Sequence, residues 1–151
     1  MRILIVMDPG ILVPPKGYGG HERLVHMFAR EYQRIGHDVE LLVTNGSSVE
    51  GCTVHGYGKE GFPPKKLDAL LAVPKAWWFL WRNRNKFDVV HNFGRLAYLL
   101  PILNNEIKKI MTYGRVIDSR NIKYINKLPN KNIKFTAPSN WCVSTGNVAG
   151  E

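Results

Sequence analysis

The chain begins MRILIVMDPGILVPPKGYGGHER (residues 1–23), and the order of elements in these residues sets the expected architecture. Residues 3–7 are consecutive apolar residues, too few for a helix core and typical of a strand buried on both faces of a parallel sheet. Prolines and glycines in residues 8–18 exclude regular structure there. From Gly20 onward, apolar residues recur at the three-and-four spacing of an amphipathic helix. In a unit of strand, glycine-bearing loop and helix, the first turn of the helix directs its free backbone N–H groups to the space above the sheet. A phosphate or another anion is the expected ligand there.

Strand and helix patterns alternate along the rest of the chain. Strands are expected at residues 38–44, 52–55, 87–91, 107–112 and 134–137, and helices at 66–83, where Pro74 should break or kink the helix, and at 96–103. Residues 118–131 receive no assignment. The alternation predicts one α/β domain over residues 1–151, a Rossmann-like doubly wound parallel sheet. Ligands of such a sheet bind beyond the carboxyl ends of its strands, so the expected site loops are residues 8–20, 91–95, 112–115 and 138–141.

Length and composition restrict the class of protein further. The chain has 151 residues and an apolar fraction of 44%, which suits one globular domain with a real core. No apolar run is long enough to span a membrane, and the first apolar run ends at Asp8 without the features of a signal peptide. Cys52 and Cys142 lack partners at metal-ligand spacing and are expected to be free thiols. We therefore expect a cytoplasmic protein.

The net charge of +9 favours an anionic partner such as nucleotide phosphates, an acidic acceptor or anionic lipid. Much of the excess lies in residues 108–134, where the basic residues are spaced out and indicate a solvated face. No recognised nucleic-acid motif accompanies the charge, so nucleic acid is not an expected partner.

A dinucleotide-binding domain is the obvious competitor, and the sequence argues against it. Its G-x-G-x-x-G turn follows the first strand directly, whereas the connection here is much longer and its glycines are Gly17, Gly19 and Gly20. The second predicted strand ends in Val43-Thr44-Asn45 without the carboxylate that binds ribose. The Gly-Lys-Ser/Thr of a nucleoside triphosphatase loop is also absent from the sequence.

Another pattern does fit. Six features follow one another in the sequence. They are an apolar strand, a long Pro/Gly loop, Gly19-Gly20-x-Glu22-Arg23, a helix, Asp88-Val89-Val90-His91 and a strand running into Ala137-Pro138-Ser139. The chain thereby resembles the amino-terminal domain of GT-B glycosyltransferases of family 4. The resemblance covers residues 1 to about 146, and its two main motifs are specific only in combination.

The resemblance implies a retaining enzyme of hexosyltransferase type that transfers a sugar from a nucleotide diphosphate sugar, without a metal or a covalently bound cofactor. Its amino-terminal domain binds the acceptor, which is a carbohydrate, a lipid-linked molecule or a small molecule. A carboxy-terminal domain binds the donor; that domain is not within these residues, so we expect this chain alone to be inactive.

Candidate site residues follow from this resemblance and from the loop positions. Gly19 and Gly20 match the family's glycine loop for the donor phosphate and sugar, and Arg23 is a candidate contact to the same anion. Glycine suits this place because it lets the backbone approach a ligand. The glycines could instead serve only the unusual dihedral angles of a helix start, and Glu22 there is explained equally well by the helix dipole.

The catalytic candidates are His91, which could also be a hydrogen-bonded core histidine, and Tyr113, which stands where the family usually has a histidine. The candidate acceptor contacts share positions on the favoured loops: they are Asn92, Arg95 and Arg115. No metal ligands are expected.

Residues 75–86, KAWWFLWRNRNK, combine tryptophans with basic residues. Because the apolar residues are consecutive and a strand follows at once, we favour a helix packed on the sheet. Tryptophan and basic residues also suit a membrane interface, so peripheral contact with the inner face of a membrane stays open. A second reading of the whole chain is a non-catalytic basic Rossmann-like module that recruits a partner or an anionic surface.

Overall fold

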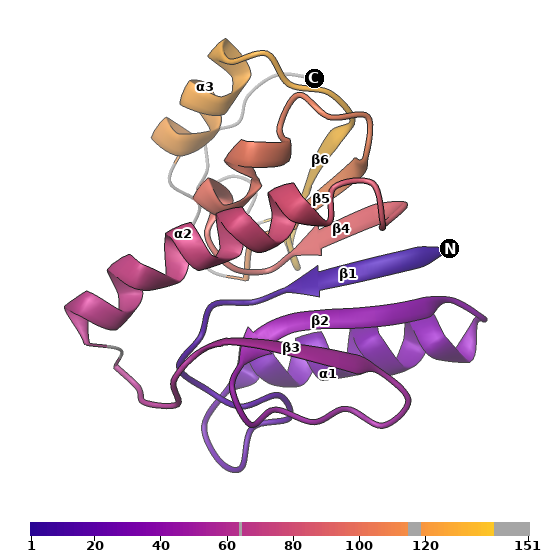
Figure 1. Ribbon diagram of the computed structural model, residues 1–151, viewed down its shortest axis with the longest axis vertical. Coiled ribbons are helices and arrows are strands. Elements are labelled where there is room, and N and C mark those ends of the chain that lie inside the picture. The colour runs from indigo at the N-terminus through magenta and orange to yellow at the C-terminus, as the bar shows by residue number, and fades with distance from the viewer. Residues whose placement is uncertain (64, 115–118, 141–151) are drawn as a thin grey trace.

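The computed structural model describes residues 1–63, 65–114 and 119–140, and its centre is a parallel sheet of six strands (Figure 1). The sheet order is β3-β2-β1-β4-β5-β6, so the opening strand lies in the middle. The strands are β1 (Arg2–Val6), β2 (Asp38–Thr44), β3 (Thr53–Gly58), β4 (Val89–Asn92), β5 (Lys108–Thr112) and β6 (Ile133–Thr136). All pairs are parallel, which confirms the predicted Rossmann-like α/β sheet. The strand order reverses between β1 and β4, and such a switch point is where ligands of this fold bind.

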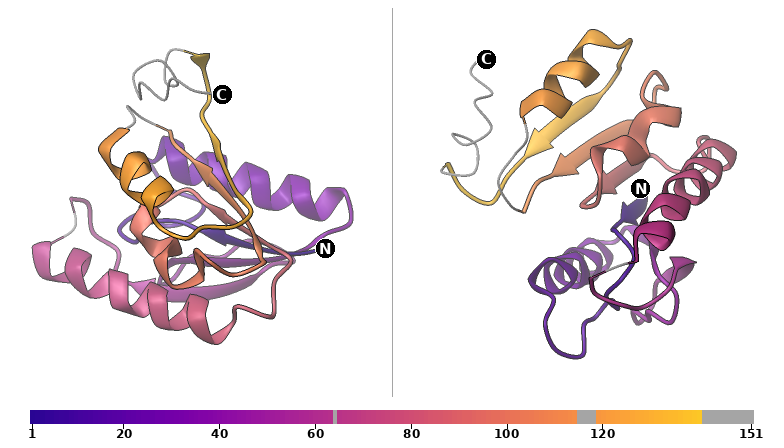
Figure 2. Two further views of the ribbon diagram at one scale, coloured as in Figure 1. Left: turned by 90° about the horizontal axis from the view of Figure 1, so that it is seen from above. Right: turned by 90° about the vertical axis from the view of Figure 1, so that its left-hand side faces the viewer.

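Side chains of β1 alternate between two apolar layers. Ile3 and Ile5 belong to the layer beneath α1 (Gly20–Arg34), whereas Leu4 and Val6 belong to the layer on the opposite face. That second layer lies beneath α2 (Lys66–Arg82), the 3-10 helix η1 (Leu96–Ile102) and α3 (Ser119–Lys127) (Figure 2). Because both faces of β1 are covered, its run of apolar residues has no polar positions between them.

The predicted strands are confirmed within a few residues, two other expectations are corrected, and one unassigned segment proves to be helical. The unassigned residues 118–131 contain α3, a short amphipathic helix that buries Ile122 and Ile125. Residues 96–102 form a 3-10 helix. The helix at 66–82 is not broken at Pro74 but runs through it. Ala72 and Ala76 pack on the sheet on either side of this proline, and such packing offsets the backbone hydrogen bond that proline cannot donate.

The helix that contains residues 75–82 packs on the sheet, as expected, but its tryptophans do not form the packed face. Trp78 and Trp81 are 61% and 55% exposed, and the face that α2 turns to the sheet carries Ala72, Ala76 and Leu80. The apolar residues are consecutive because the helix has two apolar faces, of which only one is covered.

Of the two cysteines, Cys52 is a half-buried free thiol, as expected, and Cys142 lies outside the described residues. Burial, with a smaller contribution from Asp38, raises the pKa of the Cys52 thiol to about 11. Within the described part of the chain, none of the helices has the length and apolar character required to cross a bilayer.

Candidate functional site

A cavity of about 770 Å³ lies beyond the carboxyl ends of β1, β4 and β5, at the switch point. Its lining comes from the segments that follow these strands, from the start of α1, and from η1 and α3. The main lining groups are Asp8, Pro9, His21, Glu22, Phe62, Phe93, Gly94, Arg95, Leu100, Thr112, Tyr113, Gly114, Asn121 and Tyr124. Three of the four loops expected from the sequence therefore meet in one place.

The loop after β1 is fixed by the end of β2. The Thr44 hydroxyl accepts the backbone N–H of Gly10 at 2.9 Å and donates to the carbonyl oxygen of Ile11 at 2.7 Å. The Ser47 hydroxyl accepts the N–H of Val13 at 2.9 Å. These bonds satisfy backbone groups of a loop that has no regular structure, and they hold its first residues at the cavity.

Asp8 is the central polar group of the cavity. Its Oδ1 accepts a 2.6 Å hydrogen bond from the Tyr98 hydroxyl and lies 3.5 Å from Nε of Arg95. Tyr98 itself is fully buried, and burial raises the pKa of its phenol, so the hydroxyl stays a donor. The Asp8 carboxylate thus has a fixed position, and Arg95, which is exposed, brings a cation to the same wall.

Two glycines allow the backbone to approach closely at this wall. A Cβ on Gly94 would lie 2.9 Å from the Tyr98 ring and 3.0 Å from the backbone nitrogen of Asp8. A Cβ on Gly114 would overlap the imidazole of His21. Gly94 therefore needs glycine for packing around the cavity, whereas a side chain at Gly114 would require the His21 imidazole to move.

We expect Tyr98→Phe to lower the free energy of unfolding by about 2 kcal/mol, because it removes a partly buried hydrogen bond to a charged acceptor. Urea denaturation measures this loss. The control is Tyr124→Phe, on an exposed tyrosine of the same cavity, for which the change should stay below about 0.5 kcal/mol. Equal effects of the two changes would contradict the assigned role of the Tyr98–Asp8 bond.

The glycine loop lies at the start of α1 but outside the cavity lining. Gly19, with φ of 146°, takes a conformation that other residues rarely adopt, and no side chain caps the helix. Gly20 has open space where a Cβ would stand. Arg23 donates from Nη2 to the carbonyl oxygen of Gly17 at 2.8 Å, so its guanidinium braces the loop.

His91 is buried in the sheet and does not line the cavity. Its Nδ1 lies 2.8 Å from the Tyr32 hydroxyl and its Nε2 lies 2.7 Å from the Thr112 hydroxyl. The rings of Phe28 and Phe93 lie against it, and burial lowers its pKa to about 4. The arrangement is that of a neutral, fully hydrogen-bonded core histidine.

Asn92 shapes the loop that follows β4. Its Oδ1 accepts the N–H of Gly94 at 3.0 Å, and its Nδ2 donates to the carbonyl oxygen of Arg95 at 2.9 Å. The side chain is buried beneath the loop, so it positions Arg95 while Arg95 itself reaches the cavity.

Of the residues predicted from the sequence, the structure brings Arg95 and Tyr113 together at the cavity. The cavity lining does not include the other candidates, which are His91, Asn92, Gly19, Gly20 and Arg23. Arg115 lies outside the described residues.

The sequence reasoning missed Asp8, His21 and Phe62 as lining residues. Asp8 could have been found, because it is the first polar residue after the central strand. Phe62 gave no such signal, because it reaches the cavity from the long connection between β3 and α2.

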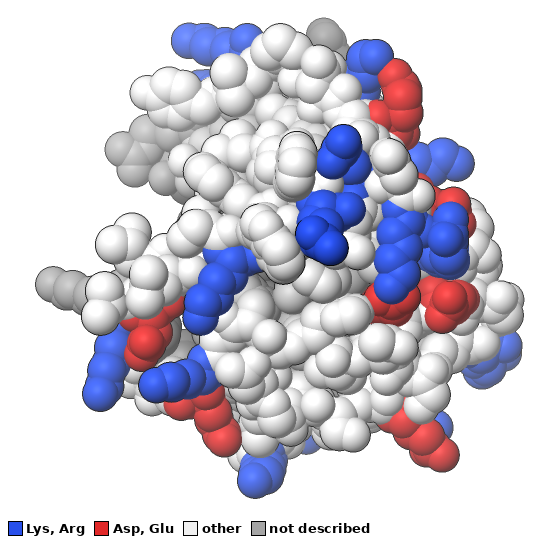
Figure 3. Space-filling model, in the orientation of Figure 1, with Lys and Arg blue, Asp and Glu red and all other residues white. Residues whose placement is uncertain are grey.

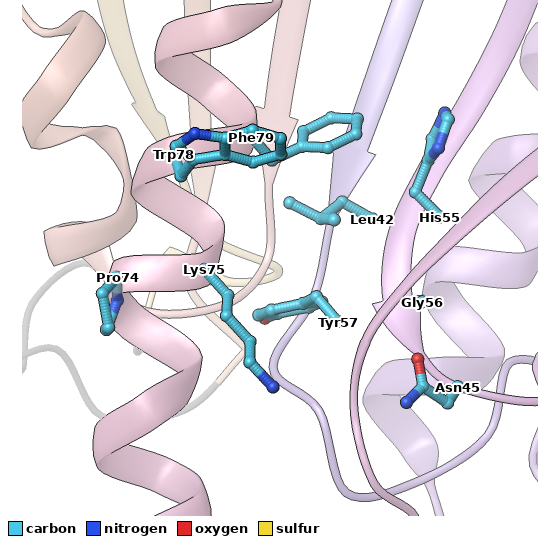
Figure 4. Close-up of a pocket in the computed structure, with 9 residues that line it drawn as sticks. All are labelled: Leu42, Asn45, His55, Gly56, Tyr57, Pro74, Lys75, Trp78 and Phe79. Carbon is cyan, nitrogen blue, oxygen red and sulfur yellow. The ribbon is translucent and has the colours of Figure 1, made fainter.

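A second hollow, of about 660 Å³, lies between α2 and the β2–β3 side of the sheet (Figure 4). Trp78 and Lys75 of α2 stand on one side of it, and His55 and Asn45 on the other. It is away from the switch point, so the larger cavity is the better candidate site. Among the described residues there is no group of three side chains from His, Cys, Asp or Glu that could hold a metal ion.

One comparison with known proteins agrees with the sequence pattern. Residues 18–133 match the sequence model of the family described as Glycosyltransferase Family 4. A comparison with curated protein sequences gives no match. Among solved structures, the C-terminal domain of the coenzyme A biosynthesis bifunctional protein CoaBC is similar, with 13% sequence identity, a TM-score of 0.47, and coverage of 83% of this chain and 69% of that chain. Since the family match covers most of its length, this chain belongs to glycosyltransferase family 4.

Proposed function

We propose that this domain is the acceptor-binding half of a retaining GT-B glycosyltransferase, which transfers a hexose from a nucleotide diphosphate sugar to an acceptor. The observation that carries the proposal is the cavity of about 770 Å³ at the switch point of a family 4 domain. A cavity of this size suits a small ligand or one sugar ring of a larger one.

The cavity offers the chemistry that a hydroxyl-bearing acceptor needs. The Asp8 carboxylate accepts hydrogen bonds, and the guanidinium of Arg95 donates them from the same wall. Phe93 and Leu100 contribute apolar surface to the same cavity. In this proposal Asp8 and Arg95 orient the attacking hydroxyl, and Tyr113 contacts the same ligand.

The donor phosphate is proposed to approach the amino end of α1, where Gly19 and Gly20 leave backbone N–H groups without a side-chain cap. Retaining transfer needs stabilisation of the leaving phosphate and of the developing positive charge on the sugar, which is mainly an electrostatic task. In the proposal, the remaining donor contacts come from a carboxy-terminal domain, present in the same chain or supplied as a partner.

We expect Arg95→Ala to lower the transfer rate of the complete enzyme by about 10- to 100-fold, because the acceptor loses an orienting contact. The enzyme is tested with its donor domain, and release of the nucleotide diphosphate is the measurement. Arg30→Ala, on the exposed outer part of α1, is the control and should keep the rate. An unchanged rate in Arg95→Ala would remove Arg95 from the acceptor site.

The glycine loop has its own test. Gly20→Trp places a large side chain in open space at the amino end of α1, so we expect the domain to fold and transfer to fall at least about 10-fold. Gly17→Trp is the matched control, since Gly17 also has open space and lies a few residues away. If both variants keep full activity, the phosphate is bound elsewhere. If the complete protein transfers no sugar from any nucleotide diphosphate sugar, the enzyme proposal itself fails.

A further inference from the structure

The outward face of α2 is an apolar stripe that nothing in the described structure covers. At about 3.6 residues per turn, one side of the helix collects its exposed residues. They are Leu67, Leu70, Leu71, Pro74, Trp77, Trp78 and Trp81. We refer to these residues as the outer stripe. Exposures of 68% at Leu70 and 61% at Trp78 show that these side chains project away from the sheet.

Basic side chains border the outer stripe. The guanidinium carbon of Arg82 lies 5.4 Å from the Trp78 ring centre, and that of Arg84 lies 4.8 Å from the Trp81 ring centre. Lys75 is exposed on the same border, and Asp68 is the one acidic residue of α2. Figure 3 shows this face of the molecule, where a largely uncharged surface over α2 is bordered by lysine and arginine side chains, with acidic side chains among them near the amino end of the helix.

We propose that the outer stripe docks this protein on an anionic lipid bilayer, with α2 lying in the plane of the interface. Leucines at one end and tryptophans at the other would enter the boundary between headgroups and acyl chains, and the arginines beside the tryptophans would reach the lipid phosphates. Charge complementarity favours this occupant over a protein surface, because the stripe combines amphipathic rings with a basic border and the chain carries a net charge of +9.

The position of the stripe is compatible with access to the cavity. The indole N–H of Trp77 donates to the carbonyl oxygen of Ala97 at 2.8 Å, which ties α2 to η1. Ala97 and the exposed Leu100 of η1 line the cavity. A bilayer on the outer stripe would therefore lie beside the cavity rim. The docking proposal goes beyond the proposed function and does not depend on sugar transfer.

Vesicle flotation of the whole chain tests the proposal. We expect the protein to float with vesicles of phosphatidylcholine and phosphatidylglycerol in equal parts, and to float much less with phosphatidylcholine alone. Trp78→Ser combined with Trp81→Ser should reduce partitioning at least about 10-fold. The matched control is Met27→Ser combined with Ile35→Ser, which removes one exposed apolar side chain from α1 and one from the residue that caps its carboxyl end, on the opposite face of the sheet. This control should leave partitioning unchanged.

A second pair of substitutions tests the contribution of the basic border. Arg82→Gln combined with Arg84→Gln should weaken binding to the anionic vesicles about 10-fold. Lys16→Gln combined with Arg30→Gln removes the same charge from other exposed positions and should weaken it much less. Circular dichroism of each variant verifies that it is folded.

Absence of flotation by the wild-type chain, or equal flotation of the tryptophan variant and its control, would overturn the proposal. If the wild-type chain self-associates in size-exclusion chromatography and the tryptophan variant does not, while neither floats, the stripe is instead an interface between copies.

Discussion

Leu80→Ala is expected to lower the free energy of unfolding by about 3 kcal/mol, whereas Trp81→Ala should lower it by less than about 1 kcal/mol. Leu80 is buried beneath α2, and its truncation leaves a cavity against the sheet. Trp81 is larger but lies on the outer stripe, where it is 55% exposed, with its ring beneath the Arg84 guanidinium. The smaller side chain therefore has the larger effect.

Urea denaturation of the two variants at one pH is the measurement. Comparing the two losses distinguishes the stability contribution of the covered face of α2 from that of the uncovered face, and it requires no knowledge of the ligand. Similar losses in the two variants would mean that the tryptophan face is packed in solution, against the arrangement described above.

The second large effect concerns pH. His91 has a pKa near 6.5 in an unfolded chain, and burial lowers it to about 4 in the fold. A base whose pKa is lower in the folded state contributes stability that is fully present above 6.5 and is lost as the pH falls from 6.5 toward 4. We expect this one group to remove about 2 kcal/mol of the free energy of unfolding between pH 7 and pH 5. The groups that face the ring are Tyr32, Thr112, Phe28 and Phe93, and none of them supplies a negative charge.

Denaturant titrations at pH 7 and pH 5 check this expectation. In His91→Asn the loss of stability between these two pH values should be smaller by about 2 kcal/mol. His26→Asn removes a histidine on the outer part of α1 and should keep the wild-type loss. If both variants lose stability as the wild type does, protonation of His91 is not the cause.

Much of the fold could be predicted, because the spacing of apolar residues along the chain distinguishes strands from helices. β2 was expected at residues 38–44 and is found there, since turn residues flank an apolar run at both ends. α3 was missed because a short helix with few apolar residues has a weak pattern among lysines and asparagines. Lys109 looked like part of a solvated face, yet it is buried, and its Nζ donates to the carbonyl oxygens of Asn105 and Ile107 at 2.7 Å. The spacing of residues in the sequence does not show that a lysine is buried with its ammonium group bonded to backbone carbonyls.

The location of the site could be predicted better than its residues. Parallel strands place their following loops at one edge, so three of the expected loops meet at the cavity. Which side chain of a loop points inward depends on local hydrogen bonds. Asn92 was expected to contact the acceptor, but its amide bonds the backbone of Gly94 and Arg95, and that bonding presents Arg95. On α2 the sequence did not reveal an exposed surface. Its apolar residues are consecutive, so the covered face and the uncovered face of the helix could not be distinguished.

The uncovered face also equips the protein with an intrinsic optical probe. The protein has four tryptophans, and three of them lie on that side of α2: Trp77, Trp78 and Trp81. The wavelength of indole emission depends on how much water surrounds the ring, so changes in the fluorescence of these residues report on α2 rather than on the cavity. Replacing Trp141 with phenylalanine would leave a chain in which every emitting indole belongs to this helix.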